Sequence, residues 1–393
     1  MSDNAALTRL VGDADTFLTD VFGQHPWHHQ TTETFTDLLS LDDVDQILAG
    51  TGLRAPSFRM VRHGVTLPQK DVTRQVRIGS RPVPDLADIA AIHRAFSDGA
   101  SLVLQGLHRS FAPVATLSRA LEMSLTHPVQ ANAYLTPPVA QGLNLHGDPH
   151  DVFAIQTHGV KRWVVHPPNG EVWDLELKPG DVLYLPAGVR HAAQTIDQPS
   201  LHLTIGVRTT GWADVVRRAV NQAFERAEFD DALPAGWAND PEQLITQSRR
   251  YIRAVVHELD DPTLADDAVA ASARAFWRNR PPDLTGGLRD LLELDHLDDH
   301  SNLRVRANVS CHFEVDNDVD NDRVKLVLGD RTLVLPATLE PTLRFIVQAH
   351  EFTPLELDEM IDHGSRLVLC RRLVREGLLT FERGARGADR ADD

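Results

Sequence analysis

The feature that most constrains this chain is a series of short apolar runs between residues 126 and 210, separated by glycine and proline. The runs are QANAYLTP, DVFAIQ, KRWVVH, EVWDLEL, DVLYLP and SLHLTIGV, and the breaks include HGD, THG, HPPNG, KPGD and PAG. Runs of this length between turn residues are typical of β-strands. Many short strands at close spacing favour a barrel or jelly roll, so we expect that fold at residues 126–210.

Within this region, His146 and Asp148 lie two positions apart. Residues i and i+2 of a strand point the same way, so both side chains can bind one metal ion. Two histidines and one carboxylate on one face of the metal form the ligand set of non-haem Fe(II) oxygenases. The pair alone is a weak signal, because 19 His and 56 acidic residues in 393 predict about 2.7 His-x-Asp/Glu matches by chance.

The sequence contains three such matches: His146/Asp148, His296/Asp298 and His312/Glu314. His296 ends a helical stretch, where positions i and i+2 do not share a face. No suitable partner motif follows His312. His150 is an alternative ligand to the first pair, but it has no carboxylate two positions later.

The first match is distinguished by a motif downstream, G-x5-P-x-G-x2-H, which runs from Gly180 to His191. Its chance occurrence is roughly 0.4%, so it is a stronger signal than His-x-Asp. Pro186 and Gly188 would bend the chain, and His191 would begin the next strand pointing inward. The motif resembles the second cupin motif, whereas the His-x-His of the first cupin motif is absent. That departure favours the 2-oxoglutarate oxygenases, with His146, Asp148 and His191 as metal ligands.

The run VKRWVV predicts a strand in which Lys161, Trp163 and Val165 share one face. If that face points inward, the lysine ammonium lies among apolar groups and needs an anion. The distal carboxylate of 2-oxoglutarate would supply it, and at ~4 Å with an effective dielectric near 20 such a pair contributes about 4 kcal/mol before desolvation. The opposite orientation, with Arg162 inward, stays open.

The regions on either side follow different patterns. Residues 1–125 mix short helical stretches, such as DLADIAAIHRAFSDG, with strand-like runs such as SLVLQGL. Residues 211–300 carry apolar residues at helical spacing in GWADVVRRAVNQAFERA, PEQLITQSRRYIRAVVHEL and ADDAVAASARAFWRN. These helices predict either an ordinary helical subdomain or a subunit interface.

The pattern of residues 301–383 predicts a last domain. VKLVLGDRTLVL is a hairpin candidate with Gly-Asp at its turn. Three helical stretches follow, PTLRFIVQAH, PLELDEMI and SRLVLCRRLVREGLL, and the unit ends on a strand at Phe381. Three helices with a β-ribbon form the winged-helix pattern. The tail at residues 384–393 is expected to be disordered.

Composition limits the class of protein. Two cysteines are too few for a disulfide framework, the N-terminus lacks a secretory pattern, and no apolar run approaches the length of a membrane span. We therefore expect a cytoplasmic protein without a membrane partner. The formal net charge of -17 argues against nonspecific binding to nucleic acid and would suit a basic partner.

These motifs together resemble the JmjC-type ribosomal oxygenases, the cupin-4 family. The resemblance rests on NAYLTPP, QGLNLHGDPHDVFAIQTHGVKRW, LKPGDVLYLPAGVRHAA and SLHLTIGV, and on the aromatic residues near the N-terminus and the C-terminal helical stretches. It implies an α+β chain. A double-stranded β-helix (the cupin/JmjC jelly roll) with N-terminal helices would span residues 1–210. A helical dimerisation domain would span 211–300, and a winged-helix domain 301–383.

The resemblance also implies roles for individual residues. His146, Asp148 and His191 would bind Fe(II), and Lys161 would bind the carboxylate of the cosubstrate 2-oxoglutarate. The assisting residues would be Tyr134, Asn132 and Thr204. Characterised members of the family hydroxylate Arg or His side chains of ribosomal proteins with O2, so we expect a homodimeric protein hydroxylase of this kind.

Two alternatives stay open. The short link between Asp148 and His191 leaves little room for insertions that contact a substrate, which would suit a peptide or small-molecule natural product. A non-catalytic cupin could instead regulate through its winged helix. The complete ligand set and Lys161 disfavour a non-catalytic regulator. The mixture of acids and arginines at residues 354–377 also disfavours it, because it is not a clean basic face.

Overall fold

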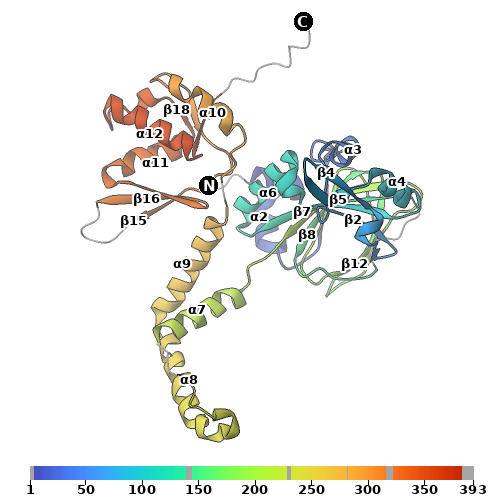
Figure 1. The fold of residues 1–393 in the computed structure, drawn as a ribbon, viewed down its shortest axis with the longest axis horizontal. Helices are drawn as coiled ribbons and strands as arrows, with labels where there is room; N and C mark the ends of the chain where they lie inside the picture. The colour runs from blue at the N-terminus through green and yellow to red at the C-terminus, as the bar shows by residue number, and fades with distance from the viewer. Residues whose placement is uncertain (1–3, 139–143, 228–231, 281, 316–321, 383–393) are drawn as a thin grey trace. The chain divides into compact units, whose positions relative to one another are not determined.

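The computed structural model describes residues 4–138, 144–227, 232–280, 282–315 and 322–382 (Figure 1). The tail expected to be disordered lies outside these residues. The chain divides into two compact units, Met1–Thr210 and Gly211–Asp393, each with its own hydrophobic core. The further boundary at residue 300 stays a prediction.

The first unit is built on an antiparallel sheet of eight strands in the order β1-β11-β8-β13-β7-β6-β2-β3. These strands are β1 (Trp27–Gln30), β2 (Phe58–Arg62), β3 (Val65–Thr66), β6 (Ser101–Gln105), β7 (Val129–Thr136), β8 (Asp151–His158), β11 (Asp181–Leu185) and β13 (Ser200–Val207). A second sheet has the order β10-β9-β12. Its strands are β9 (Lys161–His166), β10 (Trp173–Leu177) and β12 (Arg190–Gln194), and a separate hairpin joins β4 (Thr73–Ile78) to β5 (Arg81–Ala87). All six predicted strand runs are therefore confirmed.

The two sheets face each other across a small apolar cluster. Ala154 of β8 and Leu183 of β11 come from the large sheet, while Trp163 and Val165 of β9 come from the small one. All four side chains are buried. Since the chain passes from the large sheet to the small one after β8 and again after β11, residues distant in sequence line the space between the sheets.

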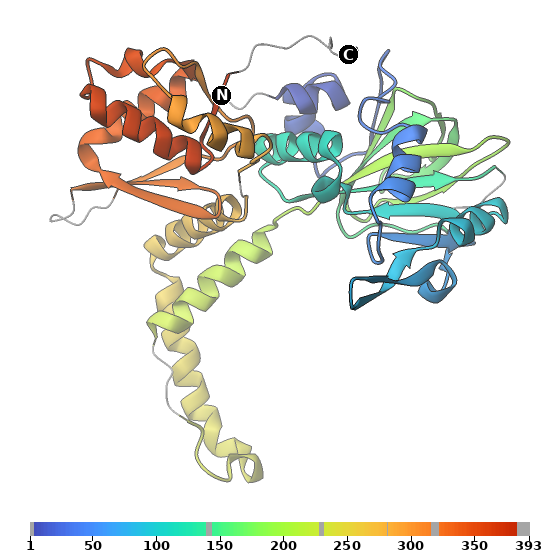
Figure 2. The same cartoon turned by 45° about the horizontal axis from the view of Figure 1, so that its top comes forward.

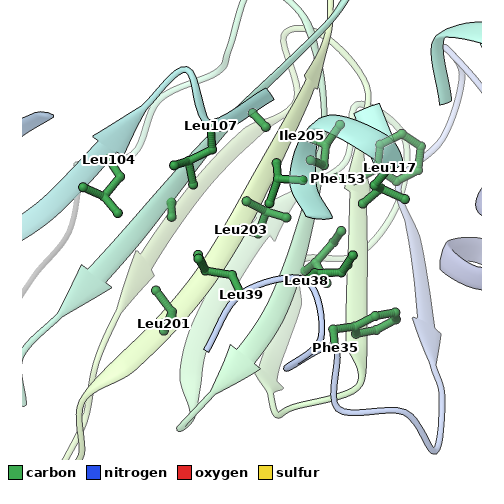
Figure 3. Packing of buried hydrophobic residues seen from close by; sticks show 14 of the residues in the cluster. Phe35, Leu38, Leu39, Leu104, Leu107, Leu117, Phe153, Leu201, Leu203 and Ile205 are labelled. Atoms are coloured by element: carbon green, nitrogen blue, oxygen red, sulfur yellow. The ribbon is translucent and has the colours of Figure 1, made fainter. Parts of the chain in front are cut away.

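Strand β13 illustrates how the sequence divides the two faces of the large sheet. Leu201, Leu203 and Ile205 are fully buried in the main core, where Figure 3 shows them packed with residues of the N-terminal segment. His202 and Thr204 alternate with them and line a cavity on the other face. The period of two thus separates core residues from candidate site residues.

Helices cover the outer face of the large sheet. They are α1 (Ala5–Val11), α2 (Ala14–Thr16), the π-helical turn η1 (Phe17–Val21), α3 (Leu41–Gly50), the 3-10 turn η2 (Gln69–Asp71), α4 (Ile89–Ser97), α5 (Leu107–Ser110) and α6 (Ala112–Leu125). Ser40 and Asp43 cap the start of α3 reciprocally. The stretch predicted to be helical from residue 85 becomes helical only at Ile89, because Asp88 caps α4 and residues 81–87 pair as β5.

The second unit begins with helices and ends in a mixed domain (Figure 2). Its first elements are α7 (Trp212–Arg226), η3 (Trp237–Asn239), η4 (Pro241–Leu244), α8 (Ile245–Leu259), α9 (Pro262–Arg278), α10 (Gly287–Glu293) and η5 (Leu294–His296). They are followed by β14 (Leu303–Val305), β15 (His312–Val315), β16 (Arg323–Leu328), β17 (Arg331–Pro336), η6 (Ala337–Leu339), α11 (Glu340–Ala349), β18 (Glu351–Phe352), η7 (Pro354–Leu357), α12 (His363–Arg375) and β19 (Leu379–Phe381).

Most of the predicted elements of this unit are confirmed. The hairpin turns at Gly-Asp, where Leu328 pairs with Arg331. The helix predicted at residues 354–361 is wrong beyond its first turn, since η7 ends at Leu357 and Asp362 caps a new helix. Across the described residues, we find no helix with the length and apolar character needed to cross a membrane.

Candidate metal centre and its cavity

Three side chains, His146, Asp148 and His191, converge in the cavity between the two sheets. Their candidate ligand atoms lie within 4.8 Å of one another. Nε2 of His146 is 3.8 Å, and Nε2 of His191 is 3.7 Å, from the carboxylate oxygens of Asp148. Two imidazoles and one carboxylate at this spacing can hold a divalent ion and leave its other positions open.

Backbone carbonyls determine which nitrogen of each histidine faces the metal position. Nδ1 of His146 donates to the carbonyl of Asn144 at 2.8 Å, and Nδ1 of His191 donates to that of Val189 at 3.0 Å. Because a carbonyl only accepts, Nδ1 carries the proton and Nε2 keeps its lone pair. Burial lowers the pKa of His191, which favours the neutral, ligating form. The donor set therefore fits a metal ion.

The two ligand-bearing segments are joined through their backbones. His146 and His191 exchange hydrogen bonds at 3.1 and 2.7 Å, and the N–H of Gly188 donates to the carbonyl of Asp148 at 2.8 Å. A Cβ on Gly147 would lie 2.8 Å from the carbonyl oxygen of Gly188. The residue between the first two ligands must therefore be glycine for the segments to approach this closely.

A buried network supports the turn before His191. Asp151 accepts hydrogen bonds from the Tyr184 hydroxyl at 2.5 Å and from the backbone N–H of Ala187 at 2.8 Å. The same hydroxyl accepts from the N–H of Gly23 at 2.7 Å, so the N-terminal segment is tied to the site. Burial raises the pKa of Tyr184, and its bond to Asp151 adds to that effect.

The cavity has a volume of about 90 Å³ and lies between β2, β6, β7, β8 and β13 on one side and β9 and β12 on the other. Lys161 lines it and is only 3% exposed, while Arg162 pairs with Asp174 at the surface. The inward orientation predicted for Lys161 and Trp163 is thus confirmed. Trp163 also stacks on the ring of His191, with the centroids 5.7 Å apart.

Lys161 is a buried ammonium whose hydrogen-bond partner is a hydroxyl. Its Nζ donates to Oγ1 of Thr136 at 3.2 Å, and the hydroxyl of Ser101 donates to the same oxygen at 3.3 Å. Burial lowers the pKa of Lys161 to about 7, with no opposing effect of a carboxylate. Sequence reasoning missed Thr136 and Ser101. Thr136 could have been found from period two, since it follows Tyr134 by two positions.

The other predicted contacts fall in different places. Tyr134 and Thr204 line the cavity together with the three candidate ligands. Asn132 does not, and its Oδ1 accepts a hydrogen bond from the N–H of Gly106 at 3.0 Å. His202, which sequence reasoning also missed, is fully buried and stacks on Tyr134 with the centroids 5.0 Å apart. Burial holds the pKa of His202 well below its ordinary value.

The remaining candidate histidines do not join the cluster. His150 lies close to the site, but its Nε2 is 2.8 Å from the side-chain nitrogen of Gln130. His296 lies in the turn η5, and His312 packs its ring against Trp277 with the centroids 4.6 Å apart. Among the described residues, the three predicted ligands are the metal-binding group that the structure brings together.

Comparison with known proteins extends the likeness beyond the motifs. The family model described as the JmjC domain matches residues 107–172 and 167–215. The NO66 protein of Dictyostelium discoideum, named a bifunctional lysine-specific demethylase and histidyl-hydroxylase, is 31% identical over 348 residues, covering 74% of this chain and 67% of that protein. The protein of the same name from Drosophila persimilis is 29% identical over 210 residues, covering 48% of this chain. The chain spans only 29% of that relative's length.

A solved structure has the same fold. The Escherichia coli ribosomal oxygenase YcfD is 19% identical, with a TM-score of 0.53 over 94% of this chain and 98% of that one. YcfD has also been solved with cobalt and 2-oxoglutarate, and that structure is 17% identical with a TM-score of 0.50 over the same shares of the two chains. The match confirms the expected mixed α+β fold of the cupin/JmjC type.

Proposed function

This chain belongs to the JmjC-domain family that includes the ribosomal oxygenases, and from that premise we propose that it is an Fe(II)- and 2-oxoglutarate-dependent oxygenase that hydroxylates a protein side chain. His146, Asp148 and His191 would hold the iron, and the ring and carboxylate atoms they present support this assignment.

The observation that carries the proposal is the buried ammonium of Lys161 in the same cavity as the metal ligands. Among the residues that the structure describes, no carboxylate pairs with it. A dianionic cosubstrate that chelates the metal at one end would bring its other carboxylate to Lys161 and Thr136. The complex of YcfD with 2-oxoglutarate supports this choice of cosubstrate.

Bound iron supplies the oxidising chemistry, in which O2 and 2-oxoglutarate yield succinate, CO2 and a hydroxylated substrate carbon. The chain supplies position and exclusion of water. His146, Asp148 and His191 would hold the iron, and Lys161 would fix the far carboxylate of the cosubstrate. We include Tyr134 and Thr204 in the cosubstrate site because both line the cavity, and the contribution of Asn132 stays a prediction.

For the substrate, we propose an Arg or His side chain of a ribosomal protein. The support is the function for which the relatives are named, a histidyl-hydroxylase and a ribosomal oxygenase, together with the net charge of -17, which favours the approach of a basic partner. A peptide or small-molecule substrate is the second candidate, favoured by the short chain between the second and third metal ligands.

We also propose that residues 211–300 form a homodimer interface and that residues 301–383 form a winged helix. On α7 and α8, the apolar side chains of Val216, Ile252 and Val256 are more than half exposed. Ile252 and Val256 also line an apolar groove of about 580 Å³. The hairpin of β16 and β17 with helices α10, α11 and α12 supports the winged-helix assignment.

The test is to incubate the full chain with Fe(II), 2-oxoglutarate, O2 and purified ribosomal proteins, and to measure intact masses. We expect one ribosomal protein to gain one oxygen atom, and tandem mass spectra to assign it to Arg or His. Turnover of 2-oxoglutarate without any modified ribosomal protein would move the substrate to the second candidate. Absence of 2-oxoglutarate binding would reject the enzyme assignment itself.

A further inference from the structure

A basic stretch runs from β2 to β5 in the first unit, although the chain as a whole is acidic. Between Phe58 and Pro84 the sequence carries six basic residues and one acidic residue, whereas the whole chain carries 39 and 56. The six are Arg59, Arg62, Lys70, Arg74, Arg77 and Arg81. Net charge describes a surface only on average, so this segment can contact an anionic partner that the rest of the chain repels.

The hairpin of β4 and β5 carries three of these cations on a sheet of its own at the edge of the first unit (Figure 2). Its base is fixed to the unit, where the backbone N–H of Ala55 donates to the carbonyl of Asp85 at 3.0 Å. Toward its turn the side chains are open to solvent, and Ile78 is 71% exposed. We call residues 70–83 the basic arm.

The cations of the basic arm have no anionic partner, unlike those on β2. Arg59 faces the cavity and hydrogen-bonds Tyr134, and Arg62 lies 3.7 Å from Asp98. On the arm, in contrast, four basic side chains are exposed and have no carboxylate within salt-bridge distance among the described residues. They are Lys70, Arg74, Arg77 and Arg81. Their hydrogen-bond donors are therefore available to a partner.

The residue types of the basic arm favour one kind of anion. Three of its four cations are arginines, whose planar guanidinium binds a phosphate through two parallel hydrogen bonds. The arm contains no aromatic residue, so it offers no surface on which unpaired bases could stack. A double helix presents its phosphates outward and needs no such surface. A single exposed apolar side chain, that of Ile78, is too little for insertion into a membrane.

We propose that the basic arm binds the phosphate backbone of double-helical RNA. The choice of RNA among polyanions rests on the proposed function, because a ribosomal protein is a basic protein that assembles on RNA. The acidic surface of the chain would attract the protein part of such a substrate, and the arm would contact the RNA beside it. With phosphate contacts alone, the binding is independent of base sequence.

Fluorescence anisotropy tests the arm without iron, 2-oxoglutarate or turnover. A short labelled RNA duplex is titrated with the full chain at several salt concentrations between about 50 and 200 mM. Four phosphate contacts predict that the affinity falls about a hundredfold across this range. A DNA duplex of the same length, polyglutamate and anionic lipid vesicles are titrated in parallel, and we expect each to bind no more tightly than the RNA.

Variants then assign the binding to the arm. The triple change Arg74→Gln, Arg77→Gln and Arg81→Gln should weaken binding at 50 mM salt by about tenfold or more and reduce the loss across the salt range to about threefold. The matched control neutralises three exposed arginines elsewhere in the first unit and should bind as the wild type does. Its changes are Arg94→Gln, Arg109→Gln and Arg208→Gln. Circular dichroism verifies that both variants are folded.

Three results would overturn the inference. The first is a wild type that does not bind the RNA duplex in a salt-dependent way. The second is an equal loss of affinity in the two triple variants, which would assign the effect to net charge. The third is tighter binding of the DNA, the polyglutamate or the vesicles than of the RNA. Since no iron or cosubstrate is present, these failures leave the proposed oxygenase intact, and a chain without turnover still tests the arm.

Discussion

At the scale of single residues, the candidate metal centre depends on atoms that the protein holds ready before any ion binds. The two histidines are oriented by backbone carbonyls, so no other side chain has to move to present Nε2. Trp163 further restrains the ring of His191 by stacking on it. A preorganised donor set of this kind costs little reorganisation on metal binding.

Removal of any one ligand should therefore abolish function without unfolding the chain. We expect His146→Ala, Asp148→Ala and His191→Ala each to eliminate 2-oxoglutarate turnover, measured as succinate formation, while circular dichroism stays unchanged. His296→Ala is the control and should behave as the wild type, because His296 lies in a turn of the other unit. Persisting turnover in His191→Ala would point to another third ligand, and His150 would be examined next.

We expect Lys161 to link cosubstrate affinity to pH. Burial lowers its pKa to about 7, and the carboxylate of the cosubstrate needs the charged form. Above pH 7 the free protein must take up a proton to bind, so the affinity for 2-oxoglutarate should fall as pH rises. Lys161→Ala should bind 2-oxoglutarate much more weakly at pH 7 and lose this pH dependence, while metal binding persists. Titration calorimetry from pH 6 to pH 9 measures both effects.

The same residue should lower the stability of the unloaded protein. Its pKa is about 7 when folded and returns to the ordinary 10.5 when unfolded. The unfolded chain therefore binds more protons between these values, and stability rises as pH increases through that window. Lys161→Met should be more stable than the wild type at pH 7, on the order of a few kcal/mol, with the difference shrinking toward pH 10.5. Equal urea denaturation curves at pH 7 would contradict this expectation.

At the scale of elements, the site depends on how closely two loops approach. Gly147→Ala would introduce a Cβ 2.8 Å from a backbone oxygen, which cannot withdraw without breaking the hydrogen bonds between the ligand-bearing segments. We expect a large loss of Mn(II) affinity, measured by calorimetry, with the fold retained. Gly50→Ala is the matched control, since a Cβ there meets nothing within 4 Å. Equal affinities in the two variants would count against this account.

The second prediction at this scale concerns how the N-terminal segment is attached to the large sheet. Strand β1 pairs with β11, and the Tyr184 hydroxyl of β11 connects Gly23 to Asp151. Tyr184→Phe leaves the ring in place but removes both hydrogen bonds, so unfolding free energy should fall by about 1–3 kcal/mol in urea titrations. Unchanged stability would mean that the network contributes no net stabilisation.

At the scale of the whole molecule, the prediction concerns assembly. Helices α7 and α8 expose the apolar side chains of Val216, Ile252 and Val256, and two-fold pairing is the commonest way to cover such side chains. We expect a dimer by light scattering at micromolar concentration. Ile252→Asp, at a side chain that is 60% exposed, should shift the dimer to monomer without loss of helix. A monomeric wild type would reject the proposed interface.

The sequence by itself determined the strands and the position of the candidate metal site within them. Period two and the turn residues are local signals, so they predicted the six runs and the inward face of Lys161. The His-x-Asp pair and the downstream motif identified three candidate ligands that the structure brings together, because each motif encodes its own turn or strand geometry. The same local reasoning failed at residues 354–361, where a new helix cap outcompeted continued helix.

Only the tertiary structure decided which distant residues share the cavity. Arg59, Ser101 and Thr136 come from three strands and meet Lys161 or Tyr134 through strand register, which is set by pairing between segments far apart in the chain. The contact between Gly147 and Gly188 likewise exists only once two loops have been folded together. Local propensity carries no information about such pairings, since a shift of register would keep every strand and change every neighbour.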